Sequence, residues 1–135
     1  MVRTFVDACV LIAVVQGNDS VAKQAFEIID DPNREFVVSD FLRLEVLPKP
    51  TFHKYLEQVE AYEEFFKQAS GYIEPNKKIS SDAVSLACKY DLQPVDALHI
   101  STASNSGVEE FITLEKPGKP ITRVQEVKVI SIYNS

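Results

Sequence analysis

Residues 3–17 have the sequence RTFVDACVLIAVVQG, in which one acid, Asp7, interrupts an otherwise apolar run. Residues 3–6 favour a β-strand, and residues 8–15 have the pattern of a buried helix that stops at Gly17-Asn18. A carboxylate is costly to bury unless hydrogen-bond donors or a cation surround it. Asp7 is therefore a candidate functional residue, and it is equally suited to cap the helix that follows it. The two roles are compatible, and both stand as predictions.

Outward from this segment, short apolar strands continue to alternate with helices. Strands are expected at 35–38, 110–113 and 127–132, with a turn and a brief strand at 71–75. Helices are expected at 20–29, 41–47, 52–69, 80–90 and 94–105. The alternation predicts an α/β fold in which a mainly parallel sheet is covered by helices on both faces, in three layers. The length of 135 residues suits one domain, expected to span residues 1–135.

Polar residues and prolines indicate where several of these helices begin and end. The expected start signals are Ser39 or Asp40 before 41–47, Ser80 or Ser81 before 80–90, and Pro94 in the first turn of 94–105. Pro48 and Pro50 are expected to end the helix at 41–47, because proline cannot continue a helix.

The composition is that of an ordinary soluble globular protein, with 45% hydrophobic and 25% charged residues. No apolar run approaches the ~20 residues that span a bilayer, and no small-residue cleavage site follows the first apolar run. Cys9 and Cys88 lie far apart in apolar helical patterns, so we expect two small buried hydrophobes. Nothing requires an oxidising compartment, and the expected location is the cytoplasm.

The net charge of −6 bears directly on nucleic-acid binding. A protein that holds RNA by neutralising phosphates with its own side chains is normally basic. An acidic nuclease needs carboxylates gathered around bound cations, which reverse the local field. The charge therefore excludes a simple basic RNA binder and leaves a cation-dependent one.

Four acids are predicted to lie at one edge of the sheet. In an open α/β sheet, ligands bind beyond the carboxyl ends of the strands. Asp7 and Glu115 follow strands directly, Glu45 lies on the helix after the second strand, and Asp96 lies in a first helical turn. If they converge, their mutual repulsion requires a counter-ion, and hard carboxylate oxygens suit Mg²⁺ or Mn²⁺.

Each acid also has a simpler explanation when it is taken alone. Glu45 could be a solvent-facing residue, Asp96 could complement a helix dipole, and Glu115 could be solvated beside Lys116. The two histidines, His53 and His99, have no plausible zinc partner, and a structural role is expected for both.

A stripe of apolar and aromatic residues follows the helical period of the expected helix at 52–69. Its members are Phe52, Tyr55, Val59, Tyr62, Phe66 and Ala69. Core or dimer packing is the expected role of this stripe, and base stacking is the alternative.

The sequence resembles the PIN-domain nucleases, which include the VapC-type toxins of bacterial toxin–antitoxin pairs. The resemblance covers nearly the whole chain. The matching segments are FVDACVLI at 5–12, SDFLRLEV at 39–46, PVDALHISTA at 94–103 and FITLE at 111–115. The segment at 94–103 is the most specific of the four.

The resemblance implies a PIN-like fold and hydrolysis of single-stranded RNA assisted by Mg²⁺ or Mn²⁺. Asp7, Glu45 and Asp96 would hold the metal, Glu115 would complete the acidic cluster, and Thr113 would orient it. Attack by a metal-activated water would leave a 5′-phosphate and a 3′-hydroxyl. The resemblance further implies a homodimer and an antitoxin protein that lies near the site and holds the enzyme inactive.

One residue departs from the family pattern. The family usually has Asp at the fourth acidic position, where this chain has Glu115. The extra methylene moves the carboxylate, which matters because Mg²⁺ demands near-ideal octahedral geometry.

Two other functions compete with an active nuclease. A receiver-like signalling domain would use Asp40, after the second strand, as a phosphoacceptor, although such domains need an acidic pair where this chain has Asp7-Ala8-Cys9. A catalytically weak PIN fold would act as an RNA- or protein-binding module.

Overall fold

The computed structural model describes residues 1–17 and 20–133, and its centre is a five-stranded sheet. The strand order is β3-β2-β1-β4-β5, and every neighbouring pair is parallel. The strands are β1 (Val2–Val6), β2 (Arg34–Ser39), β3 (Gly71–Ile73), β4 (Glu110–Thr113) and β5 (Lys128–Ser131). The predicted α/β fold with a mainly parallel sheet is thereby confirmed.

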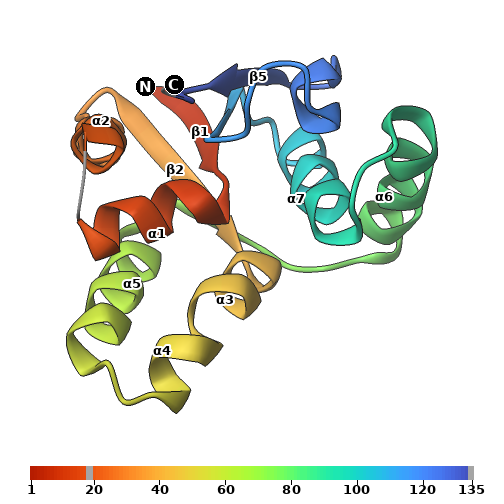
Figure 1. Ribbon diagram of the computed structural model, residues 1–135. Helices are drawn as coiled ribbons and strands as arrows, with labels where there is room; N and C mark the ends of the chain where they lie inside the picture. Colours follow the sequence, from red (N-terminus) through yellow and green to blue (C-terminus); the bar gives the residue numbers. More distant parts are fainter. Residues whose placement is uncertain (18–19, 134–135) are drawn as a thin grey trace.

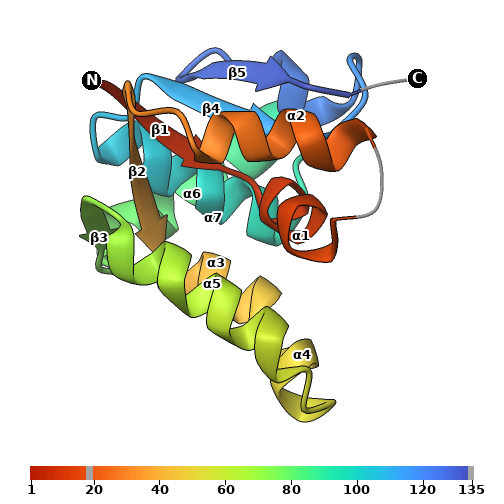
Figure 2. The same ribbon diagram turned by 90° about the vertical axis from the view of Figure 1, so that its left-hand side faces the viewer.

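Seven α-helices in the described residues flank this sheet. They are α1 (Ala8–Gln16), α2 (Ser20–Ile29), α3 (Asp40–Val46), α4 (Pro48–Phe52), α5 (Leu56–Gln68), α6 (Lys77–Tyr90) and α7 (Pro94–Asn105), and a 3-10 helix, η1 (Pro120–Arg123), precedes β5. Figure 1 shows α6 and α7 on one side of the strands, with α1, α2 and α5 on the other. Helices α3 and α4 extend away from the carboxyl end of β2 (Figure 1). Figure 2 shows α5 running beside them. The three expected layers are present.

The core lies between these layers. All four residues of β4 are buried, and Phe111 of β4 stacks on Phe5 of β1 with ring centroids 5.3 Å apart. A strand with helices on both faces must be apolar on both of its sides, because neither side meets water. This explains why the strands appear in the sequence as continuous apolar runs.

The prolines after α3 have a different effect from the one expected. Pro48 ends α3 as predicted, but it also stands at the start of the short helix α4. The first position of a helix suits proline because its missing N–H would have no intrahelical partner there. A proline in the sequence thus marks a boundary without telling whether one helix or two meet at it.

The expected single helix at 52–69 is wrong over its first four residues. Lys54 has a φ of +60°, which interrupts the helical backbone between α4 and α5. Helix α5 begins only at Leu56. The aromatic stripe is therefore divided. Tyr62 and Phe66 of α5 are buried as expected, whereas Phe52 is 81% exposed and Tyr55 is 53% exposed.

Helix α6 begins earlier in the chain than the sequence predicts. Asn76 caps this helix, with its Oδ1 accepting the Ile79 N–H at 2.9 Å, and Ser80 and Ser81 lie inside the first turns. The other boundaries agree with the sequence: Ser39 caps α3, Pro94 begins α7, and Gly17 ends α1 with a φ of +64°. Asn18, the second half of that predicted stop, lies outside the described residues.

The cysteines are only partly as expected. Both are free, but Cys9 is half-buried and Cys88 is exposed, so the prediction of a buried hydrophobe is wrong for Cys88. Within residues 1–17 and 20–133, none of the helices has the length and apolar character to cross a membrane.

Candidate metal centre

The carboxyl ends of three neighbouring strands define the site. In the sheet, β1 lies between β2 and β4, and all three run in the same direction. Asp7 comes directly after β1, Glu115 comes two residues after β4, and Glu45 lies on α3, which follows β2. Helix α7 packs against α3 and begins with Pro94, which brings Asp96 in its first turn to the same edge.

Asp7 caps a helix, as its sequence context predicted, and it is also buried. It is the N-cap of α1, with Oδ1 accepting the Ala8 N–H at 2.9 Å, and its side chain is nearly enclosed, with 6% of the residue exposed. Its second oxygen, Oδ2, accepts the Thr113 hydroxyl at 3.0 Å. Burial raises the pKa of this carboxyl above its ordinary value, and the nearby His99 and the two hydrogen bonds oppose that shift. Asp7 is thus held in place as a costly buried acid.

Thr113 connects the first acid to the last. Its hydroxyl is fully buried at the end of β4, donates to Asp7 and accepts the Glu115 N–H at 3.1 Å. One hydroxyl has one hydrogen to donate and lone pairs to accept with, so both bonds form at once. Thr113 therefore sets the position of Asp7 and the direction in which the chain leaves β4 toward Glu115.

Glu45 contacts His99, for which the sequence predicted only a structural role. Glu45 Oε1 is hydrogen-bonded to His99 Nε2, and these two groups and a carboxylate oxygen of Asp7 lie within 4.8 Å of one another. His99 is fully buried in α7, with its ring 5.3 Å from that of Phe5. The prediction that His99 has no zinc partner and a structural role stays a prediction, but the structure shows that this histidine lies beside two of the candidate acids, which the sequence analysis did not anticipate. The signal was its position three residues after Asp96, which places both side chains on one face of a helix.

Asp96 and Glu115 line a pocket together. Its other lining residues are Asp91, Leu92, Gln93, Lys119, Pro120 and Ile121. The pKa of Asp96 is raised to about 6, first by burial and then by the charge of Asp7, with Glu115 and Glu45 adding to the shift. The charges of the other three acids all raise the pKa of Asp96, and we call these four acids the acidic cluster. Of the four, only Asp7 and Glu45 belong, with His99, to the group whose candidate ligand atoms lie within 4.8 Å of one another.

The cluster has the chemistry of a hard divalent-cation site. Among the described residues, no lysine or arginine forms an ion pair with Asp7, Glu45, Asp96 or Glu115. Carboxylate oxygens are the protein ligands that Mg²⁺ and Mn²⁺ prefer, and a divalent charge offsets the mutual repulsion of the acids. The residues present fit such an ion.

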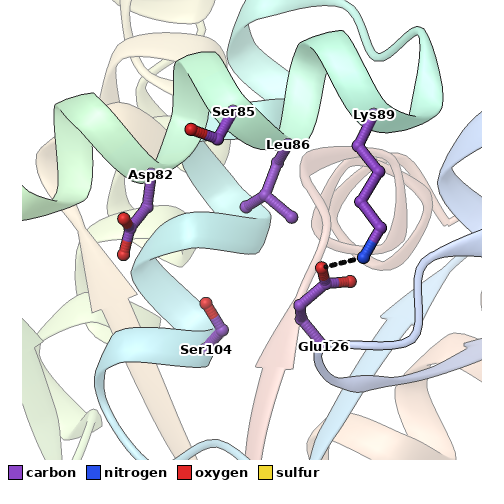
Figure 3. Close-up of a pocket in the computed structure, with 6 residues that line it drawn as sticks. All are labelled: Asp82, Ser85, Leu86, Lys89, Ser104 and Glu126. Atoms are coloured by element: carbon purple, nitrogen blue, oxygen red, sulfur yellow. Dashed lines mark hydrogen bonds and ion pairs between the residues drawn. The ribbon is translucent and has the colours of Figure 1, made fainter.

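A second pocket lies between α6, α7 and the segment that leads to β5, and it lacks this character. Figure 3 shows its lining residues, which are Asp82, Ser85, Leu86, Lys89, Ser104 and Glu126. Its charged groups already have partners: Lys89 pairs with Glu126 at 3.0 Å, and Asp82 pairs with Lys78 at 2.8 Å. The acidic cluster remains the candidate site.

The comparison with protein families decides the classification. The model of the PIN domain matches residues 4–116, which contain all four acids of the cluster. The chain belongs to the PIN-domain family. No curated protein sequence matches this PIN domain.

Solved structures share the fold of this PIN domain over almost its whole length. One is a toxin–antitoxin complex from Klebsiella pneumoniae, with 23% identity and a TM-score of 0.71 over 98% of this chain and 99% of that chain. A DNA-bound VapBC from Salmonella typhimurium has 11% identity and a TM-score of 0.73 over 97% and 98% of the two chains. VapC20 from Mycobacterium tuberculosis, described as a sarcin–ricin loop cleaving toxin, has 15% identity and a TM-score of 0.68 over 93% and 98%. At these identities the likeness shows the fold alone.

The fold and the family also bear on the receiver alternative. A receiver of the CheY type has the strand order 2-1-3-4-5, and this sheet has the order 3-2-1-4-5. Asp40, the phosphoacceptor in that reading, is exposed and hydrogen-bonded to the Tyr72 hydroxyl, and it is not part of the acidic cluster. The receiver reading is therefore excluded.

Proposed function

We propose that this PIN domain is a metal-dependent endoribonuclease that hydrolyses phosphodiester bonds of single-stranded RNA. The observation that carries the proposal is a buried acid, Asp7, in one electrostatic cluster with three further acids that have no ion-pair partner among the lysines and arginines of the described residues. Membership of the PIN family supports the choice of reaction. The proposed products carry a 5′-phosphate and a 3′-hydroxyl.

The proposed ligands of Mg²⁺ or Mn²⁺ are Asp7, Glu45, Asp96 and Glu115. A bound ion would supply Lewis-acid activation of the phosphodiester and of the attacking water. Within the chain, Thr113 and the start of α1 hold Asp7 in one orientation, so that its carboxylate needs little rearrangement to act. Lys119, in the pocket of Asp96 and Glu115, supplies a positive charge for a substrate phosphate.

Cleavage of labelled single-stranded RNA by the purified protein tests this proposal. The assay compares Mg²⁺, Mn²⁺ and a chelator, with Asp7→Asn as the matched variant because it removes the charge at nearly constant shape. We expect cleavage with either ion and none in the chelator or in the variant. Cleavage that persists in the Asp7→Asn protein would rule out this site as its source.

The alternative within the same family is a binding module without catalysis. Glu115 favours it, because this longer acid is exposed and stands outside the group formed by Asp7, Glu45 and His99. Binding of Mn²⁺ by folded protein that cuts none of several RNAs would identify this alternative.

We further propose that the protein is the toxin of a toxin–antitoxin pair and acts in the cytoplasm. The shared fold with toxin–antitoxin complexes supports an antitoxin partner. A shallow groove lined by Leu44 and Phe52, which are 68% and 81% exposed, adjoins the helix that carries Glu45 and gives such a partner an apolar surface. Expression of the protein should arrest growth and Asp7→Asn should not. Equal growth of both strains would contradict the toxin role.

The proposed assembly is a homodimer. Exposed apolar residues at the start of α5, such as Leu56 at 72%, support a surface that is covered in solution. Light scattering on the eluting protein should give about twice the chain mass of 15.2 kDa. A mass of one chain at all concentrations tested would contradict this part of the proposal.

A further inference from the structure

His99 is the one member of the site that neither the acidic cluster nor the proposed reaction requires. It is fully buried, and its Nε2 contacts the Glu45 carboxylate. Its other nitrogen, Nδ1, is the one buried side-chain nitrogen or oxygen of the described residues that has no hydrogen-bond partner. A buried polar atom without a partner needs an explanation, because it costs stability that an apolar residue of similar size would not.

The contact with Glu45 determines where the ring carries its proton. A carboxylate oxygen has only lone pairs, so a hydrogen bond to it requires a proton on Nε2. If Nε2 instead used its lone pair to bind a metal ion, the proton of the neutral ring would move to Nδ1. Metal-binding histidines almost always give that second N–H an acceptor. Nδ1 has none among the described residues, and so the geometry opposes direct metal ligation.

The position of His99 explains what the hydrogen bond achieves. The Glu45 side chain is 35% exposed and stands on a helix of only seven residues, so by itself it has several rotamers available. The imidazole is held by its burial against Phe5 and cannot follow a moving carboxylate. A rigid donor facing a flexible acid selects the rotamer that lies beside Asp7.

We propose that His99 is a positioning residue, whose Nε2–H holds the Glu45 carboxylate next to Asp7 in a geometry ready for a divalent cation, without binding the cation itself. This inference rests on the proposed metal site. It also explains why Nδ1 has no hydrogen-bond partner: the ring is buried so that Nε2–H can hold Glu45, and the loss of a partner for Nδ1 is a consequence of that burial.

The test measures Mn²⁺ binding by calorimetry, without any RNA. His99→Leu removes the donor at nearly constant volume, and His99→Gln keeps an N–H close to the position of Nε2. We expect Mn²⁺ and Mg²⁺ affinities to fall together by about 10- to 100-fold in His99→Leu, the range found when a residue that orients a metal ligand is lost. His99→Gln should stay within about threefold of the parent protein on the same reasoning.

Two controls separate positioning from a structural role. The metal-free His99→Leu protein should melt at the same temperature as the parent or higher, because a buried atom without a partner has been removed. His53→Leu, at the other histidine of the chain, should bind Mn²⁺ as the parent does, since His53 is exposed and its ring lies against those of Phe52 and Tyr55, away from the acidic cluster.

A spectroscopic measurement on the parent protein tests direct metal ligation by His99 without relying on a variant that must fold. The electron spin echo of bound Mn²⁺ should lack the modulation of a directly coordinated nitrogen. The proposal is overturned by such a modulation, by His99→Leu binding Mn²⁺ as tightly as the parent, by His99→Gln failing to restore binding, or by a parent protein that binds no Mn²⁺. A parent protein that shows the expected binding pattern but cuts no RNA defeats the nuclease proposal alone.

Discussion

At the residue scale, the acids at the two ends of the sheet differ in whether a basic side chain compensates their charge. Glu110, at the start of β4, accepts hydrogen bonds from Arg34 at 2.6 Å and from Thr4 at 2.9 Å, so its charge is compensated within the chain. Asp7 and Asp96, at the other end, have raised pKa values. A buried carboxylate with a cationic partner is a structural element, whereas one without such a partner is a candidate for chemistry.

Replacing Thr113 by Val should separate the effect of the hydroxyl from that of the side-chain shape. The change leaves Asp7 Oδ2 without its donor and the Glu115 N–H without its acceptor. We expect a loss of about 1–3 kcal/mol in the free energy of unfolding, together with weaker Mn²⁺ binding. Urea denaturation and calorimetry measure the two effects. Thr113→Ser retains the hydroxyl, and if it bound Mn²⁺ as poorly as Thr113→Val the orienting role would be wrong.

The raised pKa of Asp96 predicts an unusual pH dependence for the metal-free protein. Between the ordinary aspartate value of 3.8 and the folded value of about 6, the folded protein holds a proton that the unfolded chain releases. Folded-state proton uptake means that stability falls as pH rises through this window. The melting temperature without metal should therefore increase from about pH 7.5 to about pH 5, and the raised pKa of Asp7 acts in the same direction.

The matched variant for this prediction is Asp96→Asn. It should raise the melting temperature of the metal-free protein at neutral pH and flatten its rise toward pH 5. Saturating Mn²⁺ should stabilise the parent at neutral pH, because an ion that binds only the folded state shifts the equilibrium toward it. Thermal melts with and without chelator provide the data. A metal-free parent that becomes steadily less stable from neutral pH to about pH 5 would contradict the assigned cause.

At the element scale, helix starts determine how the site is built. Asp7 and Ser39 are caps whose side chains accept backbone N–H groups at the starts of α1 and α3, and α7 begins at Pro94 with Asp96 in its first turn. Helix N-termini favour negative charge, so the same local chemistry that begins α1 and α7 also stabilises their acids. The site is therefore a direct consequence of where three helices start after or beside parallel strands.

The cap of α6 gives a prediction at this scale. Asn76→Ala removes the acceptor of the Ile79 N–H and should cost about 1 kcal/mol of stability, the usual value for losing a side-chain cap. Ser80→Ala and Ser81→Ala, at the residues where the sequence placed the cap, should each change stability by less than about 0.5 kcal/mol. Urea unfolding midpoints of the three variants decide between the two assignments. A larger loss in either serine variant than in Asn76→Ala would reverse the conclusion.

At the scale of the whole molecule, one buried cluster connects the strands with helices from both faces. It includes Phe5 and Phe111 in the sheet, Leu11 of α1 on one side and Ile100 of α7 on the other. Elements that share a core unfold together, because exposing part of the core removes the contacts of the rest. The proposal that residues 1–135 form one domain follows from this continuity.

Calorimetry tests this proposal directly. The metal-free protein should unfold in a single transition whose calorimetric enthalpy equals the van't Hoff enthalpy. Saturating Mn²⁺ should move the whole transition to higher temperature without splitting it. Two transitions, of which only one responds to Mn²⁺, would show that the site folds separately from the rest.

The sequence by itself determined the alternation of strands and helices and the parallel character of the sheet, and it singled out four acids as candidates for one edge of that sheet, although it did not separate α4 from α5. Those features depend on local preferences. Apolar runs predict strands, Pro94 predicts a helix start, and an acid directly after a strand is visible within a few residues of sequence. The cap at Asn76 was equally local but was missed, because two serines nearby offered the same chemistry.

The tertiary structure alone decided the partner of Glu45. His99 lies 54 positions along the chain, and its contact with Glu45 exists only because α7 packs against α3. The compensation of Glu110 by Arg34, across 76 positions, is of the same kind. Distances between such residues are set by the packing of whole elements, and no pattern of neighbouring residues contains that information.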